Sequence, residues 1–473
     1  MEIKKINDTT WEIPRTGKMN VPVVFYSSAR LLKLVHADRT LDQALNVACL
    51  PGIQRSAYIM PDAHQGYGFP IGGVAAFDAD EGIVSPGGVG YDINCGVRLL
   101  KTEFMEEEVR DRREDLLAGF SREVPAGVGK GGAGRLNKKT LFEVCIRGAE
   151  WAVENGFGME EDLLRTEEYG RMKGADPSIL SQRAIERGIP QLGSLGAGNH
   201  FLEIQKVEKI YDAETAGVFG IRKTGQIMVM IHCGSRGLGH QVASDHIRLM
   251  ENTFGIKGLP DRELINAPIQ SDPGGRYFRA MTSAVNYAFA NRQMIAHRVR
   301  RVFESVLSRS QGMDQVYDVC HNVAKFEDHE VNGRTKKVCI HRKGATRSFG
   351  PGRGEIPEVY RQVGQPVLIP GSMGTASYLL AGTSEAEKLS FGSTAHGAGR
   401  VMSRHQALRS FRGEKVKEDM KKKGIELRAT SWKGVAEEAA PAYKDVDEVV
   451  RVSHEAGLGR LVARLVPVGV MKG

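Results

Sequence analysis

The chain has 473 residues, of which 41% are hydrophobic, and it carries a formal net charge of +8 with an isoelectric point near 9.0. A chain of this length can bury a large core, whereas no apolar run approaches the length of a membrane span and the first residues lack the apolar core of a signal peptide. Six cysteines without a CxxC pair argue against a disulfide framework and a zinc ribbon, so we expect a cytoplasmic protein with reduced thiols. The positive net charge favours a polyanionic partner.

The first predicted elements are a strand and the start of a helix within residues 21–35, which we interpret as framework. Residues 60–68 are rich in turn-forming residues and place Asp62 and His64 beside glycines, just before an apolar strand at 71–77. Asp62 either caps this turn or belongs with His64 to a functional site, and the local sequence supports both alternatives equally.

A glycine run at residues 87–96 brings a carboxylate, Asp92, and a thiol, Cys95, to the start of a strand predicted at 96–102. Glycine allows tight turns and the close approach of a ligand, and aspartate oxygen and cysteine sulfur are both metal donors. We therefore interpret the run as half of a metal site. For this pair alone, a buried cysteine beside a turn aspartate is the alternative. The charged residues 103–113 predict a solvated helix after the strand.

Two glycine-rich loops follow. Residues 124–139 interleave glycines with lysine and arginine residues, which either touch phosphates or form a solvated connection, and a helix is predicted at 141–155. The second loop, at 191–200, leads into an alternating strand at 201–205. Because this loop precedes a strand and does not open a helix, it is not a dinucleotide-binding motif.

The next strand is predicted at 226–231 and ends in His232. A glycine loop that carries Arg236 and His240 follows it, and a helix is predicted from 241 to 251.

The longest predicted helix covers residues 278–308, where apolar residues recur at helical spacing. Four of its arginines form either a basic face or, as the favoured alternative, a solvated surface: Arg292, Arg298, Arg300 and Arg301. A strand predicted at 316–323 carries His321 among apolar residues, where a single histidine is usually a core residue.

Four residues with metal-binding side chains lie at the ends of predicted strands or within them: Cys95, His200, His232 and His321. Strand ends in one sheet converge, so these side chains and Asp92 could supply most ligands of two transition-metal ions and leave positions for phosphate oxygens. A single zinc site fits the same residues.

Residues 391–400 carry His396 and Arg400 just before a helix predicted at 401–408. A helix N-terminus favours an anion, Arg400 can bind a phosphate, and a neutral imidazole at His396 could attack phosphorus. On local grounds, a histidine that caps the turn is an equal alternative.

The sequence contains no internal repeat, low-complexity tract or long linker, so we expect a single domain over residues 1–473. Strands and helices interleave irregularly. The expected fold is therefore α+β, with mixed central β-sheets that carry the metal ligands at strand ends and helices that flank the sheets.

Six separated motifs, in the same order along the chain, closely resemble the RtcB family of RNA-splicing ligases. They lie at residues 87–96, 198–200, 232–237, 321–325, 370–374 and 396–400. The resemblance covers essentially the whole chain, and none of the six motifs departs from the family pattern.

The resemblance implies a GTP- and manganese-dependent ligase that joins an RNA 2′,3′-cyclic phosphate or 3′-phosphate end to a 5′-hydroxyl end. Its RNAs would be cleaved tRNA halves or broken RNAs, in tRNA splicing or RNA repair, and the family often works with a small activator, archease. His396 would be the nucleophile, which becomes guanylyl-histidine and passes GMP to the RNA as RNA-ppG. Cys95 would bridge two Mn²⁺ ions, of which His232 and His321 complete one site and Asp92 and His200 the other.

The same resemblance implies two further groups of residues. The GTP pocket would be formed by Asn199, Glu203, Asn322, Ser372, Ser377, Ala398, Gly399, Arg400, Tyr443 and Lys472. The RNA phosphates would lie along Arg236, Lys343, Arg347, Arg353 and Arg404, together with Arg400. Lys472 is next to the C-terminus, where the apolar run 461–471 could dock it as a strand.

Two absent motifs agree with this interpretation, because the sequence has neither the KxDG of lysine-dependent nucleotidyltransferases nor a GxxxxGK[ST] loop. A metal-dependent phosphodiesterase that hydrolyses RNA ends is the rival enzyme, since it needs the metals without His396. A basic RNA-binding module with structural zinc is the rival from another class.

Overall fold

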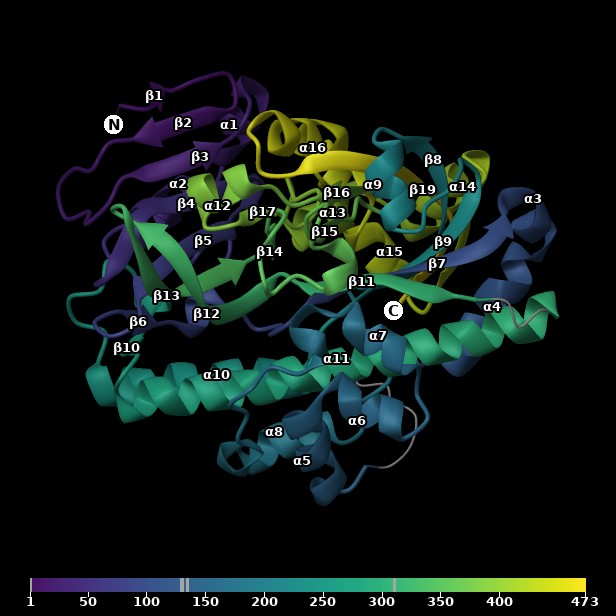
Figure 1. Ribbon diagram of the computed structural model, residues 1–473, viewed down its shortest axis with the longest axis horizontal. Helices are drawn as coiled ribbons and strands as arrows, with labels where there is room; N and C mark the ends of the chain where they lie inside the picture. The colour runs from purple at the N-terminus through teal and green to yellow at the C-terminus, as the bar shows by residue number, and fades with distance from the viewer. Residues whose placement is uncertain (1, 128–131, 133–135, 309–311) are drawn as a thin grey trace.

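The computed structural model describes residues 2–127, 132, 136–308 and 312–473. In this part of the chain, two large β-sheets lie at the centre of the molecule and helices pack around them (Figure 1). No helix among the described residues is both long enough and apolar enough to cross a membrane.

The first large sheet has the strand order β1-β2-β3-β4-β5-β13-β12 within the described residues. Its pairs are antiparallel except β3 with β4. The strands are β1 (Lys4–Lys5), β2 (Thr10–Ile13), β3 (Val23–Tyr26), β4 (Ile53–His64), β5 (Ile71–Asp78), β13 (Arg334–Lys343) and β12 (Asn322–Val331).

The second large sheet has the order β11-β7-β9-β8-β19-β16-β15, and β18 pairs in parallel with β19. Every residue of β9 is buried, because its apolar run lies in the middle of this sheet. The strands are β11 (Asp314–Cys320), β7 (Gly96–Met105), β9 (Gln226–Cys233), β8 (Phe201–Ile210), β19 (Arg460–Lys472), β16 (Ser377–Ala381), β15 (Pro366–Ile369) and β18 (Glu426–Ala429). Two small pairs join β6 (Ile83–Val84) to β10 (Ala267–Pro268) and β14 (Ala345–Arg347) to β17 (Ser393–Ala395).

The longest helix, α11 (Asp272–Leu307), runs along the molecule beneath the sheets, and α5, α6 and α8 lie on its other side (Figure 1). Ser271 caps its N-terminus by accepting a hydrogen bond from the amide of Gly274. The other helices are α1 (Ala29–Val35), α2 (Thr40–Val47), α3 (Glu106–Val109), α4 (Arg113–Glu123), α5 (Lys138–Arg147), α6 (Ala149–Glu154), α7 (Glu160–Leu164), α8 (Gln182–Gly188), α9 (Ala213–Val218), α10 (Arg236–Phe254), α12 (Ser384–Ser390), α13 (Arg404–Ser410), α14 (Gly413–Lys422), α15 (Trp432–Glu437) and α16 (Val446–Glu455).

The structure confirms the α+β class and the sheets with candidate metal ligands at strand ends. The predicted strands at 71–77, 96–102, 201–205 and 226–231 are present within β5, β7, β8 and β9. Residues 128–131 and 133–135 of the basic loop predicted at 124–139 lie outside the described part of the chain.

Three predicted boundaries in the first half are wrong. Residues 60–64 are not a turn but the end of β4, whose pairing with β5 shifts register before His64. Residues 103–113 are not one helix, because β7 stays paired with β9 as far as Met105. The helix predicted at 141–155 is divided between α5 and α6 at Gly148, whose φ of 58° no helix accommodates.

Three boundaries in the second half are also wrong. Arg236 and His240 lie in the first turns of α10 and not in a loop. The strand predicted at 316–323 is two strands, because β11 ends at Cys320 in one large sheet and β12 begins at Asn322 in the other. The helix predicted from 401 begins at Arg404, after a capping serine, so its N-terminus is not adjacent to His396.

The solvated surface predicted for the four arginines of α11 is wrong for Arg292 and Arg298, which are buried, whereas Arg300 is half-buried and Arg301 is exposed. Arg292 is fully buried. Its guanidinium binds both carboxylate oxygens of Asp318 in β11 and donates to the backbone carbonyls of Asn94 (2.8 Å) and Cys233 (2.9 Å). Asp318 also accepts from Arg98 of β7 (2.6 Å). One buried ion-pair network thus joins three strands of the second large sheet to α11.

We predict that Arg292→Met lowers the free energy of unfolding by about 3–5 kcal/mol, because it removes one member of a buried ion pair and leaves two buried carbonyls without a donor. Urea denaturation would measure the change. Arg301→Met is the matched control at an exposed position of the same helix, with an expected change within about 0.5 kcal/mol. An Arg292→Met protein as stable as the control would contradict the role given to this network.

Candidate active site

Strand pairing brings four candidate metal ligands to one edge of the second large sheet. Gly96 pairs with both Cys233 of β9 and Cys320 of β11, and Phe201 pairs with His232. The residues next to these pairs are Cys95, before β7, His200, before β8, and His321, after β11. The pairing register of β7, β8, β9 and β11 therefore brings together side chains that are up to more than two hundred residues apart in the sequence.

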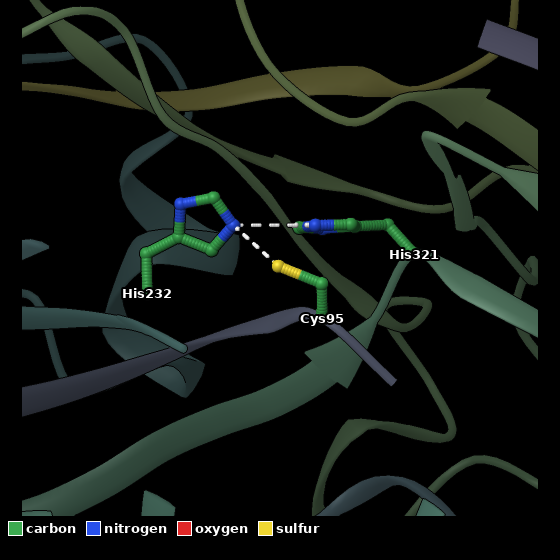
Figure 2. A group of neighbouring side chains, drawn as sticks. All are labelled: Cys95, His232 and His321. Atoms are coloured by element: carbon green, nitrogen blue, oxygen red, sulfur yellow. Dashed lines mark hydrogen bonds between the residues drawn. The ribbon is translucent and has the colours of Figure 1, made fainter. Parts of the chain in front are cut away.

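The first candidate group is formed by Cys95, His232 and His321, which point toward one another in Figure 2. The Nε2 atom of His232 lies 3.2 Å from the sulfur of Cys95 and 3.2 Å from Nε2 of His321. All three residues are buried.

The second candidate group shares the same thiol and consists of Asp92, Cys95 and His200. Nε2 of His200 lies 2.8 Å from an oxygen of Asp92 and 3.3 Å from the sulfur of Cys95. The side chain of Asp92 is 31% exposed, so this group faces solvent on one side.

The protonation of the two buried histidines suits metal binding. Burial, reinforced by neighbouring imidazoles, lowers the pKa of both His232 and His321 well below the usual value, which keeps a lone pair available. His232 donates its Nδ1 proton to the carbonyl of Asn199 (3.1 Å), so its Nε2 atom faces Cys95 as a free donor.

The donors fit two transition-metal ions better than a neutral core. Burial and the charge of Asp92 raise the pKa of the Cys95 thiol to about 12, so a protonated thiol would be the resting form without a cation. Among the described residues, Nδ1 of His200 and Nδ1 of His321 are buried without a hydrogen-bond partner. Imidazole, thiolate and carboxylate together are ligands for divalent transition metals.

His396 follows β17 and stands beside this cluster, with its ring centroid 4.9 Å from that of His321. Its Nδ1 donates to the buried carboxylate of Asp62 over 2.5 Å, and the same oxygen accepts the backbone amides of His396 (3.0 Å) and Gly397 (3.1 Å). Burial alone would raise the pKa of Asp62, but His396 outweighs this effect and lowers it, so Asp62 stays ionised. The Nε2 lone pair of His396 is therefore free.

The backbone beside this pair leaves room only for glycine. Gly399 has a φ of 73°, and a Cβ atom there would lie 1.9 Å from the carbonyl oxygen of Asp62. The 396–399 turn is thus fixed directly against the end of β4.

A cleft of about 710 Å³ opens in front of His396. Seven of the ten residues predicted for GTP line it: Asn199, Ser372, Ala398, Gly399, Arg400, Tyr443 and Lys472. Lys472 belongs to β19, as predicted, and its ammonium donates to the carbonyl of Gly198 (2.6 Å).

The other three predicted GTP residues are not among those that line the cleft. Glu203 is buried on β8, on the same strand face as the cleft residue Phe201, and burial raises its pKa to about 8. Ser377 accepts hydrogen bonds from Gln205 (3.0 Å) and from the amide of the cleft residue Gly371 (3.2 Å). Asn322 donates to the carbonyl of Asp92 (3.1 Å) and so supports the metal loop.

Among the cleft residues that the sequence analysis did not single out is a buried carboxylate. Glu438, which follows α15, accepts hydrogen bonds from Arg400 (3.2 Å), Arg404 (3.3 Å) and the hydroxyl of Tyr443. Its sequence context, a second glutamate at the end of a short helix, resembles an ordinary solvated surface and gives no signal.

The predicted RNA contacts are scattered. Arg404 lines the cleft, and Arg236 lies near the metal loops, where it donates to the carbonyl of Gly127 (3.0 Å) and to the hydroxyl of Ser194 (3.3 Å). Arg353 pairs with glutamates away from the cleft.

Two of these predicted contacts are buried. Lys343 donates to the carbonyls of Phe69 (3.1 Å) and Gly87 (3.0 Å), and Arg347 pairs with Glu167 (3.2 Å). Neither side chain lies on the cleft surface.

His64 also lines the cleft, and its Nδ1 lies 3.1 Å from the carbonyl of Asp62. Burial lowers its pKa to about 4, so it is neutral.

Comparison with known proteins gives a consistent result. The family model described as tRNA-splicing ligase RtcB matches residues 43–473. The tRNA-splicing ligase RtcB of Thermococcus kodakarensis is 55% identical over all of this chain and 99% of its own length, and that of Archaeoglobus fulgidus is 54% identical with the same coverage. The RNA-splicing ligase RtcB of Mycobacterium tuberculosis is 53% identical over 91% of this chain and its own full length.

These matches confirm the resemblance predicted from the six motifs, because each extends over nearly the whole chain at more than half identity. The chain therefore belongs to the RtcB family of tRNA-splicing ligases.

Proposed function

We propose that this protein is an RNA ligase of tRNA splicing and RNA repair, which uses GTP to join a 2′,3′-cyclic phosphate or 3′-phosphate end to a 5′-hydroxyl end. The supporting observation is the Asp62–His396 pair, whose free nitrogen faces the cleft beside the candidate metal ligands. Family membership supports the same activity.

In the first step, Nε2 of His396 attacks the α-phosphorus of GTP, a nitrogen–phosphorus bond forms and pyrophosphate leaves. Asp62 stabilises this step in two ways. It keeps the proton on Nδ1, so that Nε2 is the nucleophile, and its negative charge offsets the positive charge that develops on the ring.

The later steps use the guanylylated His396. Water opens a cyclic phosphate to a 3′-phosphate, whose oxygen displaces His396 from the GMP phosphorus and so forms RNA-ppG. The 5′-hydroxyl oxygen of the second RNA then attacks the RNA 3′-phosphorus, and GMP leaves. His396 returns to its free form after each cycle.

Cys95 with His232 and His321 would hold one Mn²⁺ ion, and the same thiolate with Asp92 and His200 would hold a second. When bound, these ions would neutralise negative charge on the attacking and leaving oxygens of the phosphates. The chain's own residues fix where the phosphates can lie, because the cleft, His396 and the donor cluster share one wall.

A hydrolase is the weaker candidate, because the buried Asp62 has no task in metal-assisted hydrolysis of an RNA end. Three hydrogen bonds converge on one of its oxygens, and all three come from His396 and Gly397. These hydrogen bonds therefore position His396 and do not position the candidate metal ligands.

The guanine of GTP would be recognised at the end of the cleft that Lys472 and Tyr443 line. One oxygen of Glu203 is buried without a partner in the described part of the chain, and a guanine ring offers two N–H donors that match a carboxylate. Arg400 and Asn199 are in position to contact phosphate or ribose.

We also treat residues 1–473 as a single ligase domain in the cytoplasm, with archease as a candidate activator. The domain proposal is supported by the site itself, which draws on residues from Asp62 to Lys472. The activator and the compartment rest on family membership alone.

We predict that labelled GTP with Mn²⁺ transfers a guanylate to the wild-type chain and not to His396→Ala. Asp62→Asn should slow the labelling by about 100-fold or more, because an amide donates to Nδ1 and leaves the proton on Nε2. Equal labelling of His396→Ala and wild type would remove the proposed nucleophile.

We predict that Cys95→Ala loses bound Mn²⁺ and ligates at least about 100-fold more slowly, since the thiol is the donor that both candidate groups share. Metal analysis and RNA ligation would measure the two effects. Cys49→Ala is the control at a cysteine outside the site, where neither quantity should change. Full metal content in Cys95→Ala would contradict a bridging role.

We predict that guanosine binds more tightly as pH rises from about 6 to 8. Because burial raises the pKa of Glu203 to about 8, its carboxyl is protonated below this pH and cannot accept both guanine donors. The affinity should change up to about tenfold per pH unit below this pKa. Calorimetry on Glu203→Gln should show weak binding without this slope, and an unchanged slope would rule out Glu203 as the guanine acceptor.

A further inference from the structure

Most of the chain's net positive charge lies in one segment, residues 404–433, which we call the basic lobe. It holds ten lysine and arginine residues against four acidic ones, a net charge of +6 in a chain that carries +8. All ten basic residues are exposed. The rest of the chain is therefore nearly neutral.

The basic lobe has its own small core and forms part of the cleft wall. Helices α13, α14 and α15 and strand β18 pack together around Met420, Ile425, Leu427 and Val435. The same cluster includes Met373, which lines the cleft, and Arg404 and Gln406 at the start of α13 line it as well. The lobe is therefore continuous with this part of the cleft wall.

Three cations of the lobe lie on elements that pack together: Arg409 on α13, Arg412 just before α14 and Lys433 on α15. α15 contacts both α13 and α14, and Gly413 lets α14 approach α15 closely, because a Cβ atom there would lie 2.2 Å from the carbonyl oxygen of Trp432. Within the described residues, none of the three cations forms an ion pair. The indole of Trp432, which is 43% exposed, lies next to Lys433 in the chain.

A groove of about 460 Å³ beside α14 has mixed charge. It is lined by Lys417, Lys421, Arg428 and the indole of Trp432, but also by Glu114 and Asp115 of α4. These carboxylates oppose a polyanion. Arg409, Arg412 and Lys433 do not line this groove.

The cleft itself is too small for a whole RNA. Its volume of about 710 Å³ corresponds to a pocket for one ligand of nucleotide size, so the body of any RNA must lie outside it. A backbone of regularly spaced phosphates fits cations that have no acidic partner, and an exposed aromatic ring fits an unpaired base.

We propose that Arg409, Arg412 and Lys433 bind backbone phosphates of the RNA strand outside the cleft, and that Trp432 stacks on one of its bases. Contacts of this kind hold a strand without reading its sequence. The inference deepens the proposed function, because it takes RNA as the polyanion from that function.

The test is a triple variant, Arg409→Gln with Arg412→Gln and Lys433→Gln, assayed for binding of a 20-nucleotide single-stranded RNA with a 3′-phosphate at several salt concentrations. Loss of three phosphate contacts should make the slope of log affinity against log salt less steep by about 2, at about 0.7 per phosphate. At low salt the affinity should fall on the order of tenfold. Guanylylation by GTP and Mn²⁺ should stay at the wild-type rate, because no RNA takes part in it.

A matched control removes three charges elsewhere, with Lys4→Gln, Lys257→Gln and Arg334→Gln at exposed positions outside the lobe and the cleft. Its salt slope should equal that of the wild type. A lobe variant with the wild-type slope, or a control with the same loss, would overturn the proposal.

Two further measurements keep the result decisive. If the triple variant is unfolded by circular dichroism, Arg409→Gln and Lys433→Gln are tested singly, each with an expected change in slope of about 0.7. RNA binding needs no catalysis, so the two proposals can fail separately. A wild-type chain that binds RNA through the basic lobe but is not guanylylated would contradict the proposed function and still support RNA binding by the lobe.

Discussion

The buried guanidinium of Arg292 is the interaction on which the candidate site depends. It holds the carbonyls of Asn94 and Cys233, which are the neighbours in sequence of Cys95 and His232, and it pairs with Asp318 in the strand that leads to His321. Three ligand-bearing strands are therefore fixed from behind by one rigid planar group. Metal ligands need placement within a fraction of an ångström, and a fully buried ion pair supplies it at the cost of desolvation.

The proposed nucleophile is held by a separate part of the structure. Asp62 comes from the first large sheet and His396 follows a strand of a small pair, whereas the candidate metal ligands Cys95, His200 and His232 lie in the second large sheet or just before its strands. The cleft lies where these parts meet, and β19 adds Lys472 to its wall. Under the proposed function, this arrangement would place the histidine and the metal ligands beside the same phosphate.

Several features could be predicted from sequence because they are local. The sequence directly predicted the apolar strands at 226–231 and 201–205, and it contained the family motifs. The spacing of the candidate ligands fitted either one metal ion or two, and the resemblance to the family implied two. The rest depends on tertiary contacts. The local sequence left Asp62 open between a turn cap and a site residue, because a register shift in β4, and not its neighbours, fixes its position. Glu438 gave no local signal. Arg292 was misjudged although it falls in step with Ala288 and Ile295 on the apolar stripe, because an arginine alone predicts solvent unless its partner is known.

The central claim is that one cysteine thiolate is shared by two metal ions beside the histidine that receives GMP. Anomalous diffraction at the manganese edge, from crystals grown with Mn²⁺, tests it most directly. The account predicts two peaks, both within bonding distance of the sulfur of Cys95, one beside His232 and His321 and the other beside Asp92 and His200. A single peak, or two peaks that do not share Cys95, would contradict it.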